Sequence, residues 1–297
     1  MQTVALSWQH SLEVAAALAV AGGAGALASR PRIRNLAAFV RETATIALLY
    51  GLWQLAGHLS LHDTGDAFAR ARWWYDLQRT LHLPDQRSVQ NVILGHRLVV
   101  QSANLYYATM HFTMMFVFLL WLFWRHRDRY RPVRQVMAWT TLGCLLIQLV
   151  PVAPPRMFPQ LGIVDTAMLY NQSVYANGFA ADQLSAMPSV HVAWAVFVGY
   201  YAWRVSTSRW RYLGAAHAVI TIFVVVATGN HWWMDGIVAV GVLVLAAWGV
   251  FGIRTAWRTA VAQLASGPLS PLARWRTGRV VDEPALSPAL SSTAPDS

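Results

Sequence analysis

Seven apolar segments, separated by shorter polar stretches, follow one another along most of the chain. They cover residues 12–28, 36–59, 104–124, 136–153, 187–204, 212–228 and 231–253. A helix that crosses a membrane needs about 20 predominantly apolar residues, and most of these segments approach that length. The first segment is rich in alanine and glycine and gives the weakest signal. The pattern predicts an all-α fold, a polytopic transmembrane bundle of six core helices with an extra N-terminal helix.

The same pattern divides the chain into three parts. Residues 1–35 hold the N-terminal helix and a basic loop, and residues 36–253 form the transmembrane domain. Residues 254–297 are predicted to be a disordered tail, because most of them lie in a stretch rich in proline, serine and alanine. Residues 60–103 form a long polar connection. Within it, the stretch from Phe68 to His82 has the aromatic spacing of an amphipathic helix that lies in the headgroup layer.

Composition supports a membrane protein and argues against other classes. Hydrophobic residues make up 56% of the chain and charged residues only 12%, whereas a soluble domain carries about 25% charged residues. The net charge of +10 comes from arginines in short loops beside apolar segments, so we expect no nucleic-acid partner. Cys144 is the single cysteine, which excludes an internal disulfide. The sequence predicts no metal site and no cofactor, and it gives no indication of oligomeric state.

The arginines also predict the orientation in the membrane. They gather in alternate loops, at Arg30 to Arg34, Arg125 to Arg134, and Arg204 to Arg211. Loops with an excess of arginine and lysine stay in the cytoplasm. We therefore expect a multi-pass protein of the cell membrane with its N-terminus outside and its C-terminus in the cytoplasm. The intervening loops would then face the extracytoplasmic side.

The residues with chemical potential lie at segment ends that face this outer side. His191 and His231 each stand where a loop runs into an apolar segment, so each falls in the first turn of a helix, a position that favours an anion such as phosphate. Asp235 follows His231 by four residues, so the carboxylate can orient the imidazole. Arg156 ends another segment and offers a fork of donors for phosphoryl oxygens. A His-x3-Asp pair alone is more often structural, but the shared placement favours metal-free phosphoryl transfer.

Four further polar residues are candidates for a supporting role around these groups. Tyr107 and His111 are four residues apart and share one helix face. The default interpretation of His111 is a hydrogen-bonded histidine within the bundle, and the alternative is a contact to the headgroup or to the catalytic residues. Gln183 and Asn230 lie close in sequence to the two candidate histidines. We expect all four to contact the catalytic residues rather than the phosphate itself.

The motifs resemble those of the type 2 phosphatidic acid phosphatase superfamily, which includes membrane lipid phosphatases and vanadium haloperoxidases. Pro188-Ser189-Val190-His191 is similar to the Pro-Ser-Gly-His motif of that superfamily, and His231-x3-Asp235 to its last motif. Arg156 takes the place of the first basic motif. The resemblance covers roughly residues 36–253, and it is greatest to the inositol-phosphorylceramide-synthase-like branch found in actinobacteria. The sequence departs from the pattern in two places: Val190 replaces a glycine, and Val224-Val225 replaces a Ser-Arg pair.

The resemblance implies a mechanism that needs no metal and no cofactor. His231 would attack phosphorus to form a phosphohistidine, and Asp235 would hold its tautomer. His191 would act as general acid and then as general base. Arg156 and Ser189 would neutralise the phosphoryl oxygens.

Three functions remain open at this point. The first is hydrolysis of a phospholipid or a lipid (pyro)phosphate. The second is transfer of a phospho-headgroup to an alcohol, and Val224-Val225 favours it because the missing arginine weakens binding of a doubly charged phosphate. Val190 and the aromatic corner of Trp232 and Trp233 could provide an apolar wall for the acceptor. The third is a non-enzymatic transporter, which predicts ionisable residues at mid-span rather than at segment ends. In the first two cases the partner is a membrane lipid.

Overall fold

The computed structural model describes residues 7–60, 64–173 and 183–266. Within these ranges the chain is helical, with no strand and a single isolated bridge between Val152 and Ser185. The helices are α1 (Trp8–Ala26), α2 (Pro31–Ser60), α3 (Thr64–Thr80), α4 (Gln86–Leu94), α5 (Arg97–Arg125), α6 (Arg127–Gln148), α7 (Thr166–Leu169), α8 (Val190–Val205), α9 (Arg211–Ala227) and α10 (Trp233–Ser266). The predicted all-α fold is confirmed.

Each predicted apolar segment corresponds to one long helix, but membrane crossing has weaker support. Two described helices, α5 and the stretch Trp233–Gln263 of α10, are long and apolar enough to cross a membrane, and α9 is apolar but shorter. Core helices of soluble proteins can share these properties. The number of spans and their orientation therefore stay predictions.

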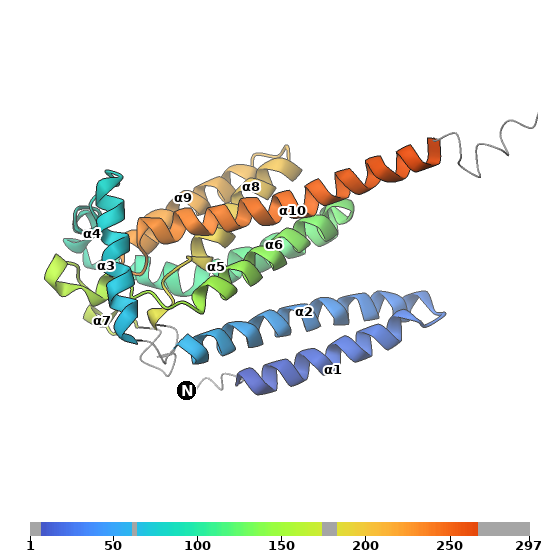
Figure 1. The fold of residues 1–297 in the computed structure, drawn as a ribbon, viewed down its shortest axis with the longest axis horizontal. Helices are drawn as coiled ribbons and strands as arrows, with labels where there is room; N and C mark the ends of the chain where they lie inside the picture. The colour runs from blue at the N-terminus through green and yellow to red at the C-terminus, as the bar shows by residue number, and fades with distance from the viewer. Residues whose placement is uncertain (1–6, 61–63, 174–182, 267–297) are drawn as a thin grey trace, which may run out of the picture. The chain divides into compact units, whose positions relative to one another are not determined.

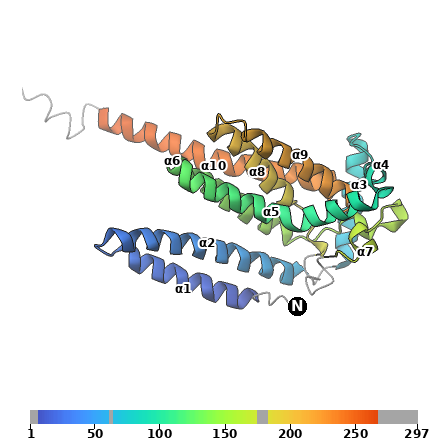
Figure 2. The same cartoon turned by 180° about the vertical axis from the view of Figure 1, so that it is seen from behind.

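The first two helices form a hairpin in which α1 and α2 lie side by side (Figures 1 and 2). Two glycines of α1 allow this close approach. A Cβ atom on Gly22 would lie 2.6 Å from Cγ of Arg41, and one on Gly25 would lie 2.9 Å from Cβ of Ala37. The Arg41 guanidinium in turn donates a hydrogen bond to the Gly22 carbonyl. The hairpin is thus packed through small residues, which is common between membrane helices.

Helix α2 also contacts α6 through polar side chains. The Glu42 carboxylate forms an ion pair with Arg134 and accepts a hydrogen bond from the Tyr130 hydroxyl at 3.3 Å. Between α5, α6, α8 and α10, an apolar core of large side chains fills the bundle, among them Phe118, Leu122, Val136, Phe197 and Leu243. The hairpin therefore joins the bundle through a polar contact, whereas the bundle itself packs through apolar ones.

One end of the bundle carries the short helices and the predicted site. Figure 1 shows α3, α4 and α7 gathered there, together with the beginnings of α5, α8 and α10 and the ends of α6 and α9. Because consecutive long helices alternate in direction, the loops with the predicted catalytic residues meet at this end. Helix α3 covers the predicted amphipathic stretch, and its Phe68 and Trp73 are exposed.

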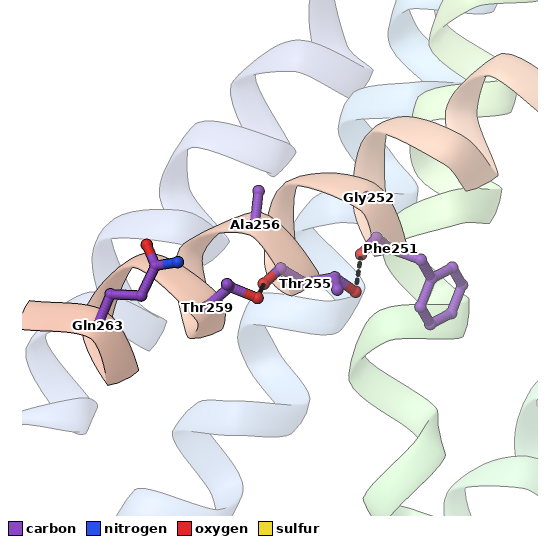
Figure 3. A pocket seen from close by; sticks show the side chains of 6 residues that line it. All are labelled: Phe251, Gly252, Thr255, Ala256, Thr259 and Gln263. Atoms are coloured by element: carbon purple, nitrogen blue, oxygen red, sulfur yellow. Dashed lines mark hydrogen bonds between the residues drawn. The ribbon is translucent and has the colours of Figure 1, made fainter. Parts of the chain in front are cut away.

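Helix α10 continues past the predicted boundary at residue 254. Residues 254–266 are helical rather than disordered, because the first helix-breaking pair after the apolar segment is Gly267-Pro268. Thr255 and Thr259 donate their hydroxyls to the carbonyls of residues four positions earlier, so the helix satisfies them internally (Figure 3). By contacts, the chain divides into residues 1–250 and 251–297. The predicted tail beyond Ser266 lies outside the described residues.

Candidate active site

His231 lies in the tight turn between α9 and α10 and is almost completely buried. Gly229 enters the turn with a φ of 71°, a left-handed conformation that glycine adopts without strain. The backbone N–H groups of Asn230 and His231 then both donate to the Val225 carbonyl at 3.1 Å. The sequence thus places the histidine in a fixed turn ahead of α10.

The ring nitrogens of His231 have different environments. Nδ1 lies 2.7 Å from the carbonyl oxygen of Ala186. A carbonyl can only accept a hydrogen bond, so Nδ1 carries the proton in the neutral ring. Nε2 then bears the free electron pair, and it is buried without a hydrogen-bond partner among the described residues. This is the tautomer that a nucleophilic Nε2 requires.

The Ala186 carbonyl is itself held by main-chain contacts. The backbone N–H of Val152 donates to the Leu184 carbonyl at 2.7 Å, and that of Ala186 donates to the Val152 carbonyl at 3.2 Å. These bonds form the isolated bridge between the two loops. The acceptor of the His231 proton is therefore fixed by backbone atoms of two different loops.

Asp235 is completely buried in the first turn of α10, whereas His231, which the sequence placed in that turn as well, lies two residues before the helix. Its carboxylate oxygen accepts a hydrogen bond from the backbone N–H of Trp232 at 2.7 Å, and it lies 3.4 Å from Nδ1 of His231. The shorter contact caps the helix, because a carboxylate at this position satisfies an otherwise unpaired N–H group. Asp235 and the Ala186 carbonyl thus both face the same histidine nitrogen.

His191 is placed by the start of α8. The Ser189 hydroxyl caps this helix by accepting from the backbone N–H of Val192 at 3.3 Å, and the backbone N–H of Ser189 donates to the Asp235 carbonyl at 3.1 Å. The His191 ring centroid lies 5.6 Å from that of His231. The two predicted histidines are therefore brought together, and Ser189 is fully buried as a helix cap beside them.

Tyr107 and His111, both on α5, pack against His191. The Tyr107 ring stacks on the His191 ring with centroids 4.3 Å apart and an interplanar angle of 15°. The His111 centroid lies 4.1 Å from that of His191, and His111 Nδ1 lies 3.1 Å from the Tyr107 carbonyl. Both residues thus contact the candidate acid–base histidine and restrict its ring orientation.

Arg156 approaches the His231 turn from the loop after α6 and is buried. Its backbone N–H donates to the Gly229 carbonyl at 2.8 Å, and its Nη1 donates to the side-chain oxygen of Asn230 at 3.0 Å. Nε lies 3.4 Å from the Asp165 carboxylate. Asn230 also donates to the Thr228 hydroxyl at 2.8 Å, so its amide orientation is fixed. Asn230 therefore positions the arginine beside the turn that carries His231.

Gln183 is less integrated into this arrangement. It is partly buried and directly follows residues 174–182, which are not described. In the described ranges, no hydrogen bond joins its side chain to the histidines. The supporting role of Gln183 stays a prediction.

Two glutamines of α4 support the site and were not predicted from the sequence. Gln86 is buried and donates its amide to the carbonyls of His231 at 2.8 Å and Val226 at 3.1 Å. Gln90, one turn later, donates to the carbonyls of Ala227 at 3.2 Å and Val164 at 2.9 Å. The signal was present, since Asp85 is a good helix cap and the two glutamines share a face.

Of the two tryptophans that the sequence suggested as a wall for an acceptor, Trp232 is enclosed, whereas Trp233 is only partly buried. Trp232 is 1% exposed, packs against Phe158 and donates its indole N–H to the Ala153 carbonyl at 2.9 Å. The indole N–H of Trp233 donates to the Pro84 carbonyl at 2.8 Å. Because Trp232 is enclosed in an apolar cluster, it is not available to pack against a second substrate.

In the part of the chain that the structure describes, no three histidine, cysteine, aspartate or glutamate side chains lie close enough together to hold a metal ion. The predicted independence from metals stays a prediction, to be tested by activity.

These contacts bring together a buried imidazole nitrogen with a free electron pair, a second histidine and a buried arginine, the residue types that metal-free phosphoryl transfer uses. The family model of the PAP2 superfamily matches residues 72–249. The match covers more than half of the chain, which therefore belongs to the PAP2 superfamily, as the motifs predicted. Membership brings phosphoesterase chemistry of the phosphatase type. No curated protein and no solved structure gave a significant match.

Proposed function

We propose that this protein is an integral-membrane lipid phosphatase or phosphotransferase that works through a phosphohistidine on Nε2 of His231. The observation that carries the proposal is the hydrogen bonding of the two nitrogens of the His231 ring. Its Nδ1 is hydrogen-bonded to the Ala186 carbonyl. Its Nε2 is buried beside His191 and has no hydrogen-bond partner among the described residues. A nucleophile held in this way is ready to attack without reorganisation of the site.

The reaction would proceed in two steps. The electron pair of His231 Nε2 attacks phosphorus, the ester P–O bond breaks, and protonated His191 gives its proton to the departing oxygen. In the second step, His191 takes a proton from water or an alcohol, whose oxygen attacks phosphorus and breaks the N–P bond. Arg156 and the N–H groups at the beginning of α8 would balance the charge on the phosphoryl oxygens.

Membrane insertion is part of the proposal. It is supported by the lengths and apolar character of α5 and α10 and by the high hydrophobic content of the chain. The arginine-rich loops lie at the helix ends opposite those that carry the histidines, so the positive-inside rule puts the site on the extracytoplasmic face and the C-terminus in the cytoplasm.

Headgroup transfer of the inositol-phosphorylceramide-synthase type is the second candidate, and one local feature favours it. Val224 and Val225 stand where related motifs carry a Ser-Arg pair, and both are buried in an apolar cluster. The Val225 carbonyl accepts from the backbone N–H of His231, and both valine side chains share the apolar cluster with Tyr107. Without the second arginine, a phosphodiester with one negative charge should be held better than a phosphate monoester with nearly two.

The test offers purified protein either radiolabelled phosphatidic acid or a labelled phosphodiester lipid, with and without an alcohol-bearing acceptor lipid, in the presence of EDTA. We expect release or exchange of the label by the wild type, label trapped on the protein, and neither with His231→Ala. His96→Ala, at an exposed histidine that makes no capping hydrogen bond, is the control. Full turnover by His231→Ala would refute the nucleophile. An exchange product in excess of free phosphate would support transfer over hydrolysis.

A further inference from the structure

A cavity of about 430 Å³ lies between α2, α5, α6 and α8. Its volume is within the range of about 300–1,000 Å³ that is usual for small-molecule sites. His111 and His191 line it at the end where α8 begins, so the cavity opens onto the candidate acid–base histidine. Along α5 it extends from His111 to Leu119, a distance of about 12 Å at 1.5 Å per residue.

Away from the histidines the cavity offers almost no free hydrogen-bonding groups. Thr141 donates its hydroxyl to the Met137 carbonyl and accepts from the Trp194 indole, and the Tyr50 hydroxyl accepts from Gln54. The rest of the lining is aliphatic, aromatic or methionine side chains. Such a lining favours a saturated chain over a polar ligand, because a polar ligand would lose its hydrogen bonds to water.

The cavity is open on one side rather than enclosed. Ile46 of α2 and Phe112 and Phe116 of α5 all line it, yet they are 56%, 51% and 61% exposed. This opening lies between two helices that the proposed function places within the bilayer. A hydrocarbon chain could therefore enter sideways from the membrane, without passing through water.

One wall of the cavity comes from outside the matched part of the chain. The family model begins at residue 72, whereas Ile46, Leu49 and Tyr50 belong to α2. Glu42, one turn before Ile46, fixes the rotation of α2 through its ion pair with Arg134. Helix α2 thus adds a wall from outside the matched residues to a cavity whose other walls lie within them.

We propose that this cavity binds a hydrocarbon chain of the lipid substrate and that α2 decides which chains fit. The proposal rests on the proposed function, since the phosphate of the same lipid would lie past His191 at His231. Met115 and Met137 line the cavity and also belong to the buried apolar core of the bundle. The extent of the cavity along α5, about 12 Å, therefore limits the length of chain that it can hold.

Leu49→Trp tests the proposal by filling the cavity. We expect kcat/KM for a long-chain lipid phosphate to fall at least about tenfold relative to that for a short-chain analogue, a difference typical of misfitted apolar pockets. Leu48→Trp is the matched control, because Leu48, next to Leu49 on the same helix, is 44% exposed and does not line the cavity. Leu119→Ala should shift the preference in the opposite direction, toward longer chains. Equal profiles for all variants would overturn the proposal.

A second measurement does not depend on turnover. A lipid phosphate with a photoreactive group at the end of its chain should label residues 46–50 or 112–119 in purified protein, and Leu49→Trp should reduce this labelling while Leu48→Trp should not. Labelling elsewhere, unaffected by Leu49→Trp, would refute the cavity as the chain site and leave the proposed activity intact. Labelling here in a protein that cleaves no lipid phosphate would support the chain site and refute the proposed function.

Discussion

At His231 the ring nitrogen Nδ1 has two acceptors within reach, the Ala186 carbonyl at 2.7 Å and the Asp235 carboxylate at 3.4 Å. In a triad where a carboxylate alone sets the tautomer, replacement by asparagine costs about 10⁴ in rate. Here the carbonyl keeps the proton on Nδ1 even without the charge. We therefore expect Asp235→Asn to lower kcat by only about 10- to 100-fold, which corresponds to the loss of one hydrogen bond to a charged group.

Single-turnover assays on purified protein would measure this loss, with thermal unfolding as the control because Asp235 also caps α10. A loss near 10⁴ with unchanged stability would mean that the carboxylate, and not the carbonyl, determines the tautomer.

The sequence predicted those catalytic candidates that stand at the ends of apolar segments. His191, His231 and Arg156 were found in this way, and the structure brings the two histidines together beside the turn that Arg156 contacts. The role of Ala186 could not be predicted, because it acts through a main-chain carbonyl that every residue type possesses. Trp232 was misinterpreted for a related reason: its position after His231 does not show which way its ring turns.

At the scale of elements, α4 contributes a buried amide to the His231 turn. Gln86→Leu removes the donor to two buried carbonyls, and leaving such groups unsatisfied costs about 1–3 kcal/mol. We expect a lower unfolding temperature and a lower kcat, because the His231 carbonyl loses its partner. Asn91→Leu, the exposed amide on the same helix, is the control and should leave both unchanged.

If Gln86→Leu instead kept full activity and stability, the hydrogen bonds from α4 to the turn would be dispensable.

The contact between α8 and α9 depends on two small residues. A Cβ atom on Gly199 would lie 3.0 Å from the Gly214 carbonyl oxygen, whereas one on Gly241 of α10 would meet nothing within 4 Å. Gly199→Ala should thus destabilise the protein by about 1–3 kcal/mol through overpacking. Gly241→Ala should be neutral or stabilise slightly, since alanine is the better helix former.

Unfolding temperatures in the same detergent would compare the two variants, and an equal effect of both would rule out close packing at Gly199.

The sequence predicted the long helices and α3 well, and α4 poorly. Apolar periodicity identified the order and type of the long helices, but α5 begins at Arg97, several residues before the predicted start at residue 104. Its first two turns are polar on one face and lacked the apolar signal. Helix α4 was assigned to a polar connection because two of the three residues that it buries are amides, which sequence patterns associate with loops.

At the scale of the whole molecule, the arginine distribution predicts sidedness. Single cysteines at Met168, exposed on α7, and at Ser208, exposed in the loop before α9, should respond differently in intact cells. An impermeant thiol reagent should label Met168→Cys and not Ser208→Cys. Cys144 is fully buried and should contribute little background. The reverse labelling would place the site in the cytoplasm.

The backbone bridge between the loops at Val152 and Ala186 has a consequence for how this protein tolerates mutation. Hydrogen bonds between main-chain atoms persist when side chains change, so these loops can drift in sequence while the catalytic tautomer is retained. Proline is the exception, because it removes the N–H group that Val152 or Ala186 donates. A saturation library at these two positions should accept many small substitutions and reject proline. Sequence divergence around this site would then be a poor measure of functional divergence.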